Sequence, residues 1–255
     1  MIEVKGLYHR YSSGGVFVLQ NVSFRVNNGQ IVALLGVNGS GKTTSMNIIT
    51  GFLRPTGGVA LVDRINSSIN PWKVRERIGY LPEEVYLYGS LSGREFLEFV
   101  ASIRHCDIEN AYHLCKALNM FDSLDQQIAT YSGGMKRKLQ LVSAIMHAPP
   151  NVILDEPTNA MDPRSTRVVR DLIIGMKKRG VAILFSTHIL EVAEKLADYI
   201  YIIHRGRIVA EGTMSELKKL AQENANLEDI FISLTGGVDE QEVAAFLSAF
   251  EGVSK

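Results

Sequence analysis

Long hydrophobic runs are missing from this sequence of 255 residues. Its apolar runs extend over roughly five to seven residues, whereas a helix that crosses a bilayer needs about 18. The first residues, Met-Ile-Glu-Val-Lys, do not form the charged and apolar regions of a signal peptide. We therefore expect a soluble, cytoplasmic chain with no membrane span of its own.

Cysteine is scarce and net charge is absent. The two cysteines, Cys106 and Cys115, match no metal-binding or redox spacing, so we expect two idle thiols in a reducing compartment. Lysine plus arginine number 27, as do aspartate plus glutamate, and the formal net charge is zero. Because no broad basic field is available to attract nucleic acid, we predict no nucleic-acid partner.

The remaining composition is that of a globular protein, with 46% hydrophobic and 21% charged residues. Short apolar strands alternate with helical segments, which predicts an α/β core with a parallel sheet. Strands are also predicted at Ile2–Tyr11 and Val16–Val26, and a hairpin turn at Asn27–Gly29 would lead into the next strand. We thus expect antiparallel strands near the N-terminus, and a second hairpin at Arg205-Gly206.

A helical region interrupts the α/β pattern. Residues 92–128 carry apolar side chains at helical spacing, and a further helix is predicted from Met135 to His147. We predict a helical subdomain over residues 83–149, inserted between the core segments 1–82 and 150–220. A helical tail is predicted over residues 221–255.

The apolar strand Ile31–Leu35 runs directly into a glycine-rich loop. Four fixed positions of the P-loop pattern are filled, by Gly36, Gly41, Lys42 and Thr43. Glycine lets backbone N–H groups approach an anion, and the following helix directs its positive end to the same place. Lys42 would reach the outer phosphates of a nucleoside triphosphate, and the Thr43 hydroxyl would bind Mg²⁺. The candidate ATP-binding residues here are Gly36, Val37, Asn38, Gly39, Ser40, Gly41, Lys42, Thr43 and Thr44.

A second apolar strand, Asn151–Asp155, ends in two carboxylates. Beside the P-loop strand, Asp155 would face the Mg²⁺ ion, directly or through water. Glu156 follows where the strand ends, and can take a proton from the water that attacks the γ-phosphate. The alternative is that the two carboxylates are simply a solvated acidic strand end. This alternative is disfavoured because a P-loop needs a carboxylate that binds its metal ion.

Several motifs, in the order of the chain, resemble the ATP-binding cassette (ABC) ATPases. Tyr131-Ser-Gly-Gly-Met135 is similar to the family signature, usually Leu-Ser-Gly-Gly-Gln, and Asn159–Asp162 resembles the D-loop. Ser186-Thr-His188 after a strand is similar to the family's switch histidine segment. The resemblance runs from Tyr11 to about Gly212. It implies an α/β fold: a RecA-like P-loop NTPase core with an N-terminal antiparallel β subdomain and an inserted α-helical subdomain.

The resemblance also implies residue roles. Tyr11 would stack on adenine, and His188 would contact the γ-phosphate and align Glu156, so that the implied catalytic residues are Lys42, Glu156 and His188. Two cassettes would pair head to tail around ATP, with Asp162 in the D-loop. The signature residues would face the nucleotide of the opposite cassette: Tyr131, Ser132, Gly133, Gly134 and Met135. Glu83 stands where the family's Q-loop has glutamine, and the implied Mg²⁺ ligands are Thr43, Glu83 and Asp155.

The function implied by the resemblance is that of an ATPase, with ATP and Mg²⁺ as cofactors, that energises a membrane exporter. The permease would be built from separate chains, and the second cassette would be an identical or a different one. We expect a peripheral protein at the cytoplasmic face of the membrane. Glu83, the signature variant and Leu227–Phe231 resemble exporter ATPases for drugs, antibiotics or ions. Candidate permease contacts, for which local core is an equal alternative, are Val85, Tyr86, Leu87 and Tyr88.

Two other functions remain open from the sequence. A soluble ATP-driven switch acting on DNA or ribosomes usually has two cassettes in one chain or an inserted coiled coil. This chain has one set of motifs, no heptad run and no basic patch. A regulatory nucleotide sensor without hydrolysis is disfavoured because Glu156 and His188 are both present.

Overall fold

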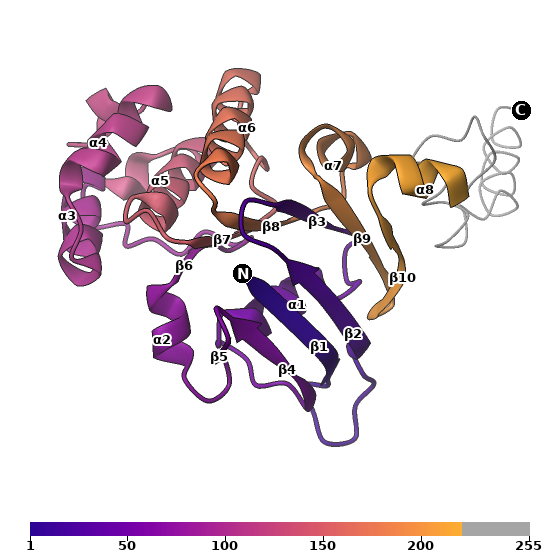
Figure 1. The fold of residues 1–255 in the computed structure, drawn as a ribbon. Coiled ribbons are helices and arrows are strands. Elements are labelled where there is room, and N and C mark those ends of the chain that lie inside the picture. Colours follow the sequence, from indigo (N-terminus) through magenta and orange to yellow (C-terminus); the bar gives the residue numbers. More distant parts are fainter. Residues whose placement is uncertain (221–255) are drawn as a thin grey trace, which may run out of the picture.

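Two β-sheets and an outlying group of helices make up the computed structural model, which describes residues 1–220 (Figure 1). The tail predicted over residues 221–255 lies outside the described residues. Within residues 1–220, no helix combines the length and apolarity that crossing a membrane requires.

A six-stranded sheet forms the middle of the molecule, in the order β10-β9-β3-β8-β7-β6. The pairs from β9 to β6 are parallel, and β10 runs antiparallel to β9, which confirms the hairpin predicted at Arg205-Gly206. Strands β3, β7 and β8 are buried along their whole length, which explains their continuous apolar sequences. The strands are β3 (Ile31–Leu35), β6 (Ile78–Leu81), β7 (Asn151–Asp155), β8 (Ala182–Thr187), β9 (Tyr199–His204) and β10 (Arg207–Gly212).

A second, antiparallel sheet has the order β2-β1-β4-β5. Its strands are β1 (Ile2–His9), β2 (Leu19–Val26), β4 (Gly57–Val62) and β5 (Ile65–Asn66). The predicted hairpin at Asn27–Gly29 is wrong, because β2 and β3 belong to different sheets. Strand β3 pairs with β8 on one edge and β9 on the other, so no edge is left for β2. The turn instead carries the chain from one sheet to the other.

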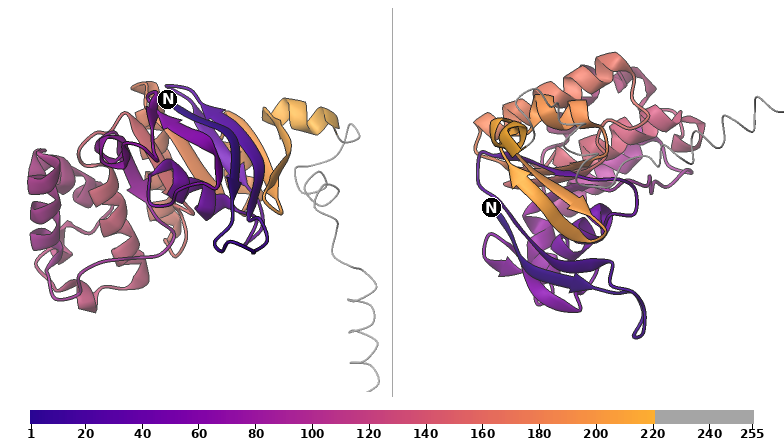
Figure 2. Two further views of the ribbon diagram at one scale, coloured as in Figure 1. Left: turned by 90° about the horizontal axis from the view of Figure 1, so that it is seen from below. Right: turned by 90° about the vertical axis from the view of Figure 1, so that its right-hand side faces the viewer.

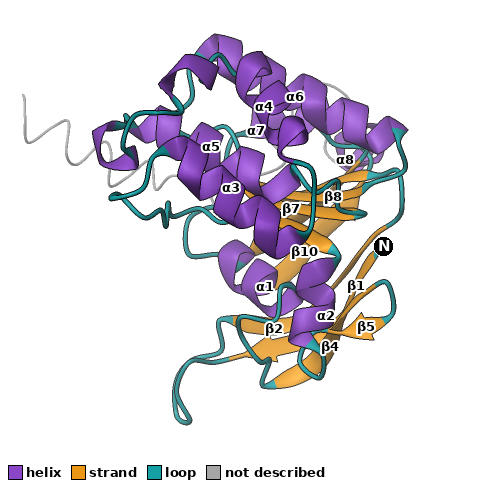
Figure 3. Ribbon diagram, turned by 90° about the vertical axis from the view of Figure 1, so that its left-hand side faces the viewer, coloured by secondary structure: helices purple, strands orange, loops and turns teal. Residues whose placement is uncertain are grey.

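Helices cover both faces of the six-stranded sheet. Helix α1 (Lys42–Ile49) contacts β4 and β7 and so lies between the two sheets, and α2 (Pro71–Glu76) contacts β5 and β6. Helices α6 (Pro163–Lys178) and α7 (Leu190–Leu196) pack on the other face, against β8 and β3. Helix α8 (Met214–Leu220) contacts β10. Figure 3 shows α1 and α2 between the antiparallel strands and the upper helical layer.

The outlying helices form one end of the molecule, away from β9 and β10 (Figure 2). They are α3 (Gly93–Arg104), α4 (Ile108–Ala117) and α5 (Gly133–Ile145), with short 3₁₀ turns at Phe121–Ser123 and Ile128–Thr130. Helix α5 begins two residues earlier than predicted, because Ser132 acts as its N-cap and its Oγ accepts a hydrogen bond from the N–H of Met135 (3.2 Å).

Two apolar clusters hold these layers together. One joins the helical end to one face of the six-stranded sheet, with Leu139 and Phe185 among its members. The other fills the space between the two sheets, with Phe24, Leu34 and Met46. Because β3, β7 and β8 are parallel neighbours or next neighbours, the loops after their carboxyl ends meet at one edge of the sheet.

Candidate nucleotide-binding and catalytic site

The loop after β3 presents backbone N–H groups at the start of α1. A side chain on Gly36 would clash with the carbonyl oxygen of Ile203, and Gly41 has a φ of 109°, so both positions favour glycine. Gly41 precedes the helix and supplies no capping side chain, so the first N–H groups of α1 are left for an anion. The loop is therefore built to bind phosphate.

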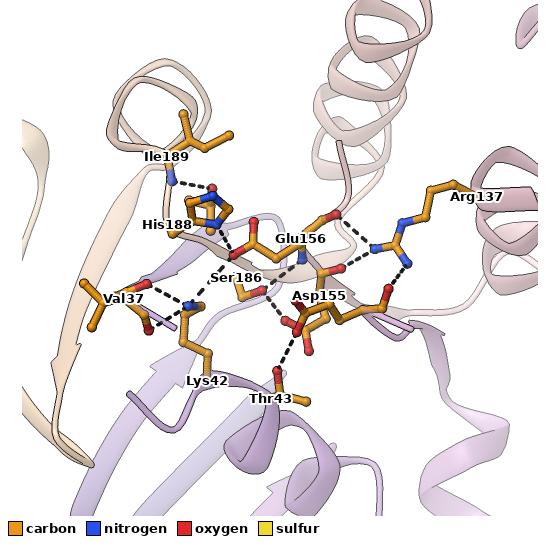
Figure 4. A network of polar contacts seen from close by, with 12 residues as sticks. Val37, Lys42, Thr43, Arg137, Asp155, Glu156, Ser186, His188 and Ile189 are labelled. Carbon is orange, nitrogen blue, oxygen red and sulfur yellow. Dashed lines mark hydrogen bonds and ion pairs between the residues drawn. The ribbon is translucent and has the colours of Figure 1, made fainter. Parts of the chain in front are cut away.

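Lys42 is folded against this loop (Figure 4). Its Nζ donates hydrogen bonds to the carbonyl oxygens of Gly36 (2.6 Å) and Val37 (3.1 Å), and lies 3.9 Å from Glu156 Oε1. Burial lowers the pKa of the Lys42 ammonium, and the negative charges of Glu156 and Asp155 oppose that shift. The ammonium thus lies between the loop and the acidic end of β7, where it can bind a phosphate group.

Asp155 ends β7 with a fully buried carboxylate. Its Oδ1 accepts a hydrogen bond from the Ser186 hydroxyl, whereas its Oδ2 is buried with no hydrogen-bond partner within residues 1–220. Such an oxygen is costly unless a cation binds it. The Thr43 hydroxyl lies 3.4 Å from Glu83 Oε2, which brings a second carboxylate to the start of α1. These oxygen atoms are of the kind that Mg²⁺ prefers.

Glu156 is nearly buried and is held on several sides. Its Oε1 lies 2.8 Å from Nδ1 of His188, which comes from the segment after β8. Its backbone N–H donates to Ser186 Oγ (2.9 Å), and its carbonyl oxygen accepts from Arg137 Nη2 (2.9 Å). Figure 4 shows the Glu156 carboxylate between Lys42 and His188. A carboxylate fixed in this way can accept a proton from a water molecule beside the loop.

Tyr11 lies next to the P-loop helix, as its proposed role requires. The Tyr11 hydroxyl is 3.0 Å from Thr44 Oγ1, and the Tyr11 side chain is 66% exposed. Its ring packs edge-on against His9, with 4.8 Å between the ring centroids. An exposed aromatic face beside the phosphate loop is available to stack on a planar base.

The signature segment has buried ends and an exposed middle. Tyr131 is buried, and its hydroxyl donates to the carbonyl oxygen of Ser123 (2.6 Å), while Met135 packs partly into the helical core. Ser132 and Gly133 are exposed at the N-terminus of α5. Tyr131 and Met135 therefore anchor the segment, and the exposed middle presents a hydroxyl and helix N–H groups outward.

Asp162 connects the D-loop to the signature helix. It caps α6 by accepting hydrogen bonds from the N–H (2.8 Å) and hydroxyl (2.6 Å) of Ser165, and its Oδ2 lies 3.1 Å from Lys138 Nζ on α5. The hydrogen bonds from Ser165, followed by the charge of Lys138, hold the pKa of the Asp162 carboxyl well below its usual range. Asp162 thus links the start of α6 to Lys138 on α5.

The geometry of the site agrees with a comparison of the sequence with known families. Residues 19–159 match the model of a family described as ABC transporter. The chain is 34% identical over 224 residues to the doxorubicin resistance ATP-binding protein DrrA of Mycobacterium tuberculosis, strain CDC 1551. That match covers 86% of this chain and 68% of that protein.

The chain belongs to the ABC transporter family.

Further comparisons agree with this assignment. The ABC transporter ATP-binding protein NatA of Bacillus subtilis is 32% identical over 223 residues, which cover 86% of this chain and 90% of NatA. A solved ATP-binding subunit of an ABC transporter superposes with a TM-score of 0.86 at 31% identity, over 92% of this chain and 99% of that one. A dimeric bacterial cassette, MJ0796, has a TM-score of 0.77 at 24% identity over 84% of this chain and 98% of that one, and shows the same fold.

This ABC cassette is an ATP-binding and ATP-hydrolysing subunit that energises a transporter. The predicted α/β fold, with a RecA-like P-loop core and an antiparallel β subdomain, is confirmed. The relatives named for drug resistance support the exporter-type subgroup. The comparisons give no support to a switch acting on DNA or ribosomes.

The sequence did not predict the roles of two residues, Arg137 and Ser186, in the polar network of the cassette. Arg137 donates to the carbonyl oxygens of Pro82, Glu83, Asp155 and Glu156, and so joins α5 to the loops after β6 and β7. The signal in the sequence was an arginine four residues before Leu141, on the apolar face of α5. Ser186 bonds both carboxylate-bearing residues because it pairs with Asp155 across β7 and β8, a register that the sequence alone did not reveal.

Proposed function

We propose that Glu156 is the general base of ATP hydrolysis in this cassette. The observation that carries the proposal is the position of its buried carboxylate, 2.8 Å from His188 and 3.9 Å from Lys42. Glu156 takes a proton from the attacking water, His188 holds the carboxylate and the γ-phosphate in line, and Lys42 neutralises the outer phosphates. Catalysis then consists mainly of positioning and charge neutralisation.

We propose that Thr43, Asp155 and Glu83 hold a Mg²⁺ ion beside the phosphates. The unpartnered Asp155 Oδ2 and the nearness of Thr43 to Glu83 support this set. Bound Mg²⁺ neutralises negative charge on the outer phosphates. Within the described residues no group of three or more histidine, cysteine, aspartate and glutamate side chains forms a metal site. Phosphate oxygens and water would complete the ligands of the ion.

We propose that two cassettes close head to tail on two ATP molecules. Ser132, Gly133 and Gly134 of one chain then face the γ-phosphate bound by the P-loop of the other, with Asp162 beside the interface. The exposed Ser132 hydroxyl and the positive end of α5 support this arrangement, because both attract an anion. The partner is a second copy of this chain or a different cassette.

We propose that a groove between the core and the helical end receives a membrane permease on a separate chain. The groove encloses about 650 Å³ and is lined on different sides by Tyr80, Glu84, Tyr86, Leu87 and Gln140. Tyr86 is 71% exposed at its mouth, which favours a partner contact over local core for this residue. The cassette is then a peripheral protein at the cytoplasmic face of the membrane, and its complex exports drugs, antibiotics or ions.

The proposed catalytic role is tested with the cassette reconstituted together with its permease in vesicles. We expect Mg²⁺-dependent ATP hydrolysis that falls by about a hundredfold or more in Glu156→Gln and in Lys42→Ala, because each removes a group that acts on the reacting atoms. Lys178→Ala is the matched control, since Lys178 is exposed in the last turn of α6. A Glu156→Gln complex with unchanged turnover would contradict the role of Glu156.

A further inference from the structure

Residues 52–77 hold a local excess of basic charge outside the nucleotide site. The segment contains five lysine and arginine residues against two acidic ones, in a chain with a formal net charge of zero. It also contains Trp72, the single tryptophan of the chain. A chain that is neutral as a whole therefore carries a locally basic segment, whereas no basic patch was expected from the sequence.

Large apolar side chains protrude from the same segment. Phe52, Ile69 and Trp72 are 58%, 72% and 57% exposed. Helix α2 is fixed beneath them by the buried Val74, and its first residue Pro71 packs against the end of α1 at Gly51. The apolar side chains therefore project from an anchored scaffold.

Cationic side chains are interleaved with these apolar groups. Lys73 Nζ lies 5.3 Å from the centre of the Trp72 ring, and the Arg75 guanidinium lies 5.3 Å from that of Phe52. Arg64, Lys73 and Arg77 line a hollow of about 580 Å³ beside α2, together with Asn66, Asn70 and Glu76. We name the set of Phe52, Arg64, Ile69, Trp72, Lys73, Arg75 and Arg77 the α2 patch.

We propose that the α2 patch binds the anionic surface of a lipid bilayer. Trp72 and Ile69 enter the headgroup layer, while Arg64, Lys73 and Arg77 contact lipid phosphates. Segments that lie on anionic membranes combine basic side chains with tryptophan and aliphatic groups at their surface. The excess of positive charge in residues 52–77, combined with the exposed Trp72 and Ile69, thus suits an anionic lipid surface.

The α2 patch is also continuous with the groove proposed for the permease, because Phe52 and Arg75 line that groove. Figure 3 shows α2 beside α1 and below α3, on the face turned to the viewer. This part of the argument rests on the proposed function: if the permease docks in the groove, the α2 patch faces the bilayer in which the permease lies. The charge and exposure of the patch do not depend on that function.

The fluorescence of Trp72 provides a direct test with the full chain and no permease. We expect its emission to shift to shorter wavelength on vesicles of phosphatidylcholine mixed with phosphatidylglycerol, and to be quenched by lipids brominated near the headgroup. Vesicles of phosphatidylcholine alone should cause little shift, because they lack the anionic charge. Raising the salt concentration should weaken the binding.

Charge reversal in the α2 patch tests the electrostatic contribution to membrane binding. Lys73→Glu combined with Arg77→Glu should lower the vesicle partition coefficient by about twentyfold or more, because each basic residue near an anionic surface contributes roughly fivefold. Arg167→Glu combined with Arg170→Glu is the matched control, as both residues are exposed on α6. That control should bind vesicles within about twofold of the unchanged chain.

Three outcomes would overturn the proposal: no emission shift on anionic vesicles, an equal shift on neutral vesicles, or equal losses in the α2 and α6 charge reversals. A shift produced by the permease in detergent but not by vesicles would assign the α2 patch to a protein partner and would also overturn it. ATP hydrolysis is measured separately on the same preparation. A hydrolysing chain that ignores vesicles contradicts the lipid proposal alone, and an inactive chain that binds them contradicts the proposed catalysis alone.

Discussion

Glu156 has a left-handed backbone conformation, with a φ of 49°, directly after the buried strand β7. That conformation is uncommon for a residue other than glycine and persists where surrounding contacts impose it. Here Ser186 holds its N–H and Arg137 holds its carbonyl oxygen. The constraint turns the Glu156 side chain away from the direction of the strand and toward Lys42 and His188.

Glu83 gives a prediction at the same scale. Glu83→Gln removes one negative charge beside the Thr43 hydroxyl, so the site should attract a divalent cation less strongly. We expect the Mg²⁺ concentration for half-maximal ATP hydrolysis to rise about threefold to tenfold. A Mg²⁺ titration of the ATPase rate at saturating ATP measures this shift.

The neighbouring carboxylate provides the control for this prediction. The Glu84 carboxylate accepts a hydrogen bond from the Tyr86 hydroxyl. Glu84 lines the groove proposed for the permease rather than the P-loop. Glu84→Gln should leave the Mg²⁺ requirement unchanged. An identical Mg²⁺ requirement in Glu83→Gln and the unchanged chain would remove Glu83 from the proposed ligand set.

At the scale of single residues, the sequence predicted the polar groups better than their contacts. Strands β3, β7 and β8 bring together the polar residues at or after their carboxyl ends, as the order of motifs suggested. These residues are Lys42, Asp155, Glu156 and His188. The Ser186 hydrogen bonds were missed because they depend on the register between β7 and β8. Strand register is decided by the packing of two buried sheet faces, and a single sequence contains no direct record of it.

Arg137 ties helix α5 to both loops that carry the catalytic carboxylates, those of Glu83 and Glu156. Burial lowers the pKa of its guanidinium, while the charges of Asp155, Glu83 and Glu156 oppose that shift. Arg137→Met would leave four carbonyl oxygens without this donor. We expect a loss of about 2–4 kcal/mol in the free energy of unfolding, measured by urea denaturation.

Lys136→Met serves as the matched control on the same helix, since Lys136 is half-buried one residue earlier. It should change the free energy of unfolding by less than about 0.5 kcal/mol. Without urea, where Arg137→Met is still folded, we expect this variant to hydrolyse ATP more slowly. The loops that carry Glu83 and Glu156 no longer share the hydrogen bonds of Arg137. An unchanged free energy of unfolding in Arg137→Met would show that the Arg137 hydrogen bonds do not stabilise the fold.

His147, just after α5, gives a prediction about pH. Burial, followed by the nearby charge of Arg104, lowers the pKa of the His147 imidazole from 6.5 to about 4. Between those values the unfolded chain binds a proton that the folded chain does not, so stability rises with pH across this window. Because the side chain is partly exposed, we expect His147 to contribute about 2 kcal/mol of the stability lost between pH 6.5 and pH 4.

His147→Gln isolates this contribution, because glutamine is polar and does not titrate. Urea unfolding at a series of pH values should give a flatter dependence for the variant between pH 6.5 and pH 4. Parallel pH profiles for the two proteins would mean that His147 titrates alike in the folded and unfolded chains.

At the scale of elements, the sequence predicted which segments are strands but not always their partners. The turn Asn27–Gly29 has the composition of a hairpin, yet β3 is buried on both faces and pairs on both edges in the parallel sheet. Tertiary pairing therefore outweighed the local turn signal. Helix α5 begins before the predicted Met135 for a local reason, because Ser132 caps the helix and the two glycines after it form its first turn.

On the proposed head-to-tail arrangement, one whole molecule carries half of each catalytic site. Lys42, Asp155, Glu156 and His188 converge around the P-loop, whereas Ser132 and Gly133 are exposed at the N-terminus of α5. The side chain of Ser132 caps its own helix, and Asp162 and Lys138 join that helix to α6. On the proposed arrangement, the signature of a second cassette supplies the missing contacts to the γ-phosphate.

The central claim is that ATP brings two such cassettes together. The most direct measurement is sedimentation velocity of Glu156→Gln, which should bind ATP without hydrolysing it. We expect ATP to convert this variant from monomer to dimer, and ADP to leave it monomeric. Adding Ser132→Phe to the variant should prevent the dimer while leaving ATP bound, because the bulky ring would occupy the exposed start of α5. A Glu156→Gln chain that binds ATP and stays monomeric alone, with its permease and with a different partner cassette would contradict the account.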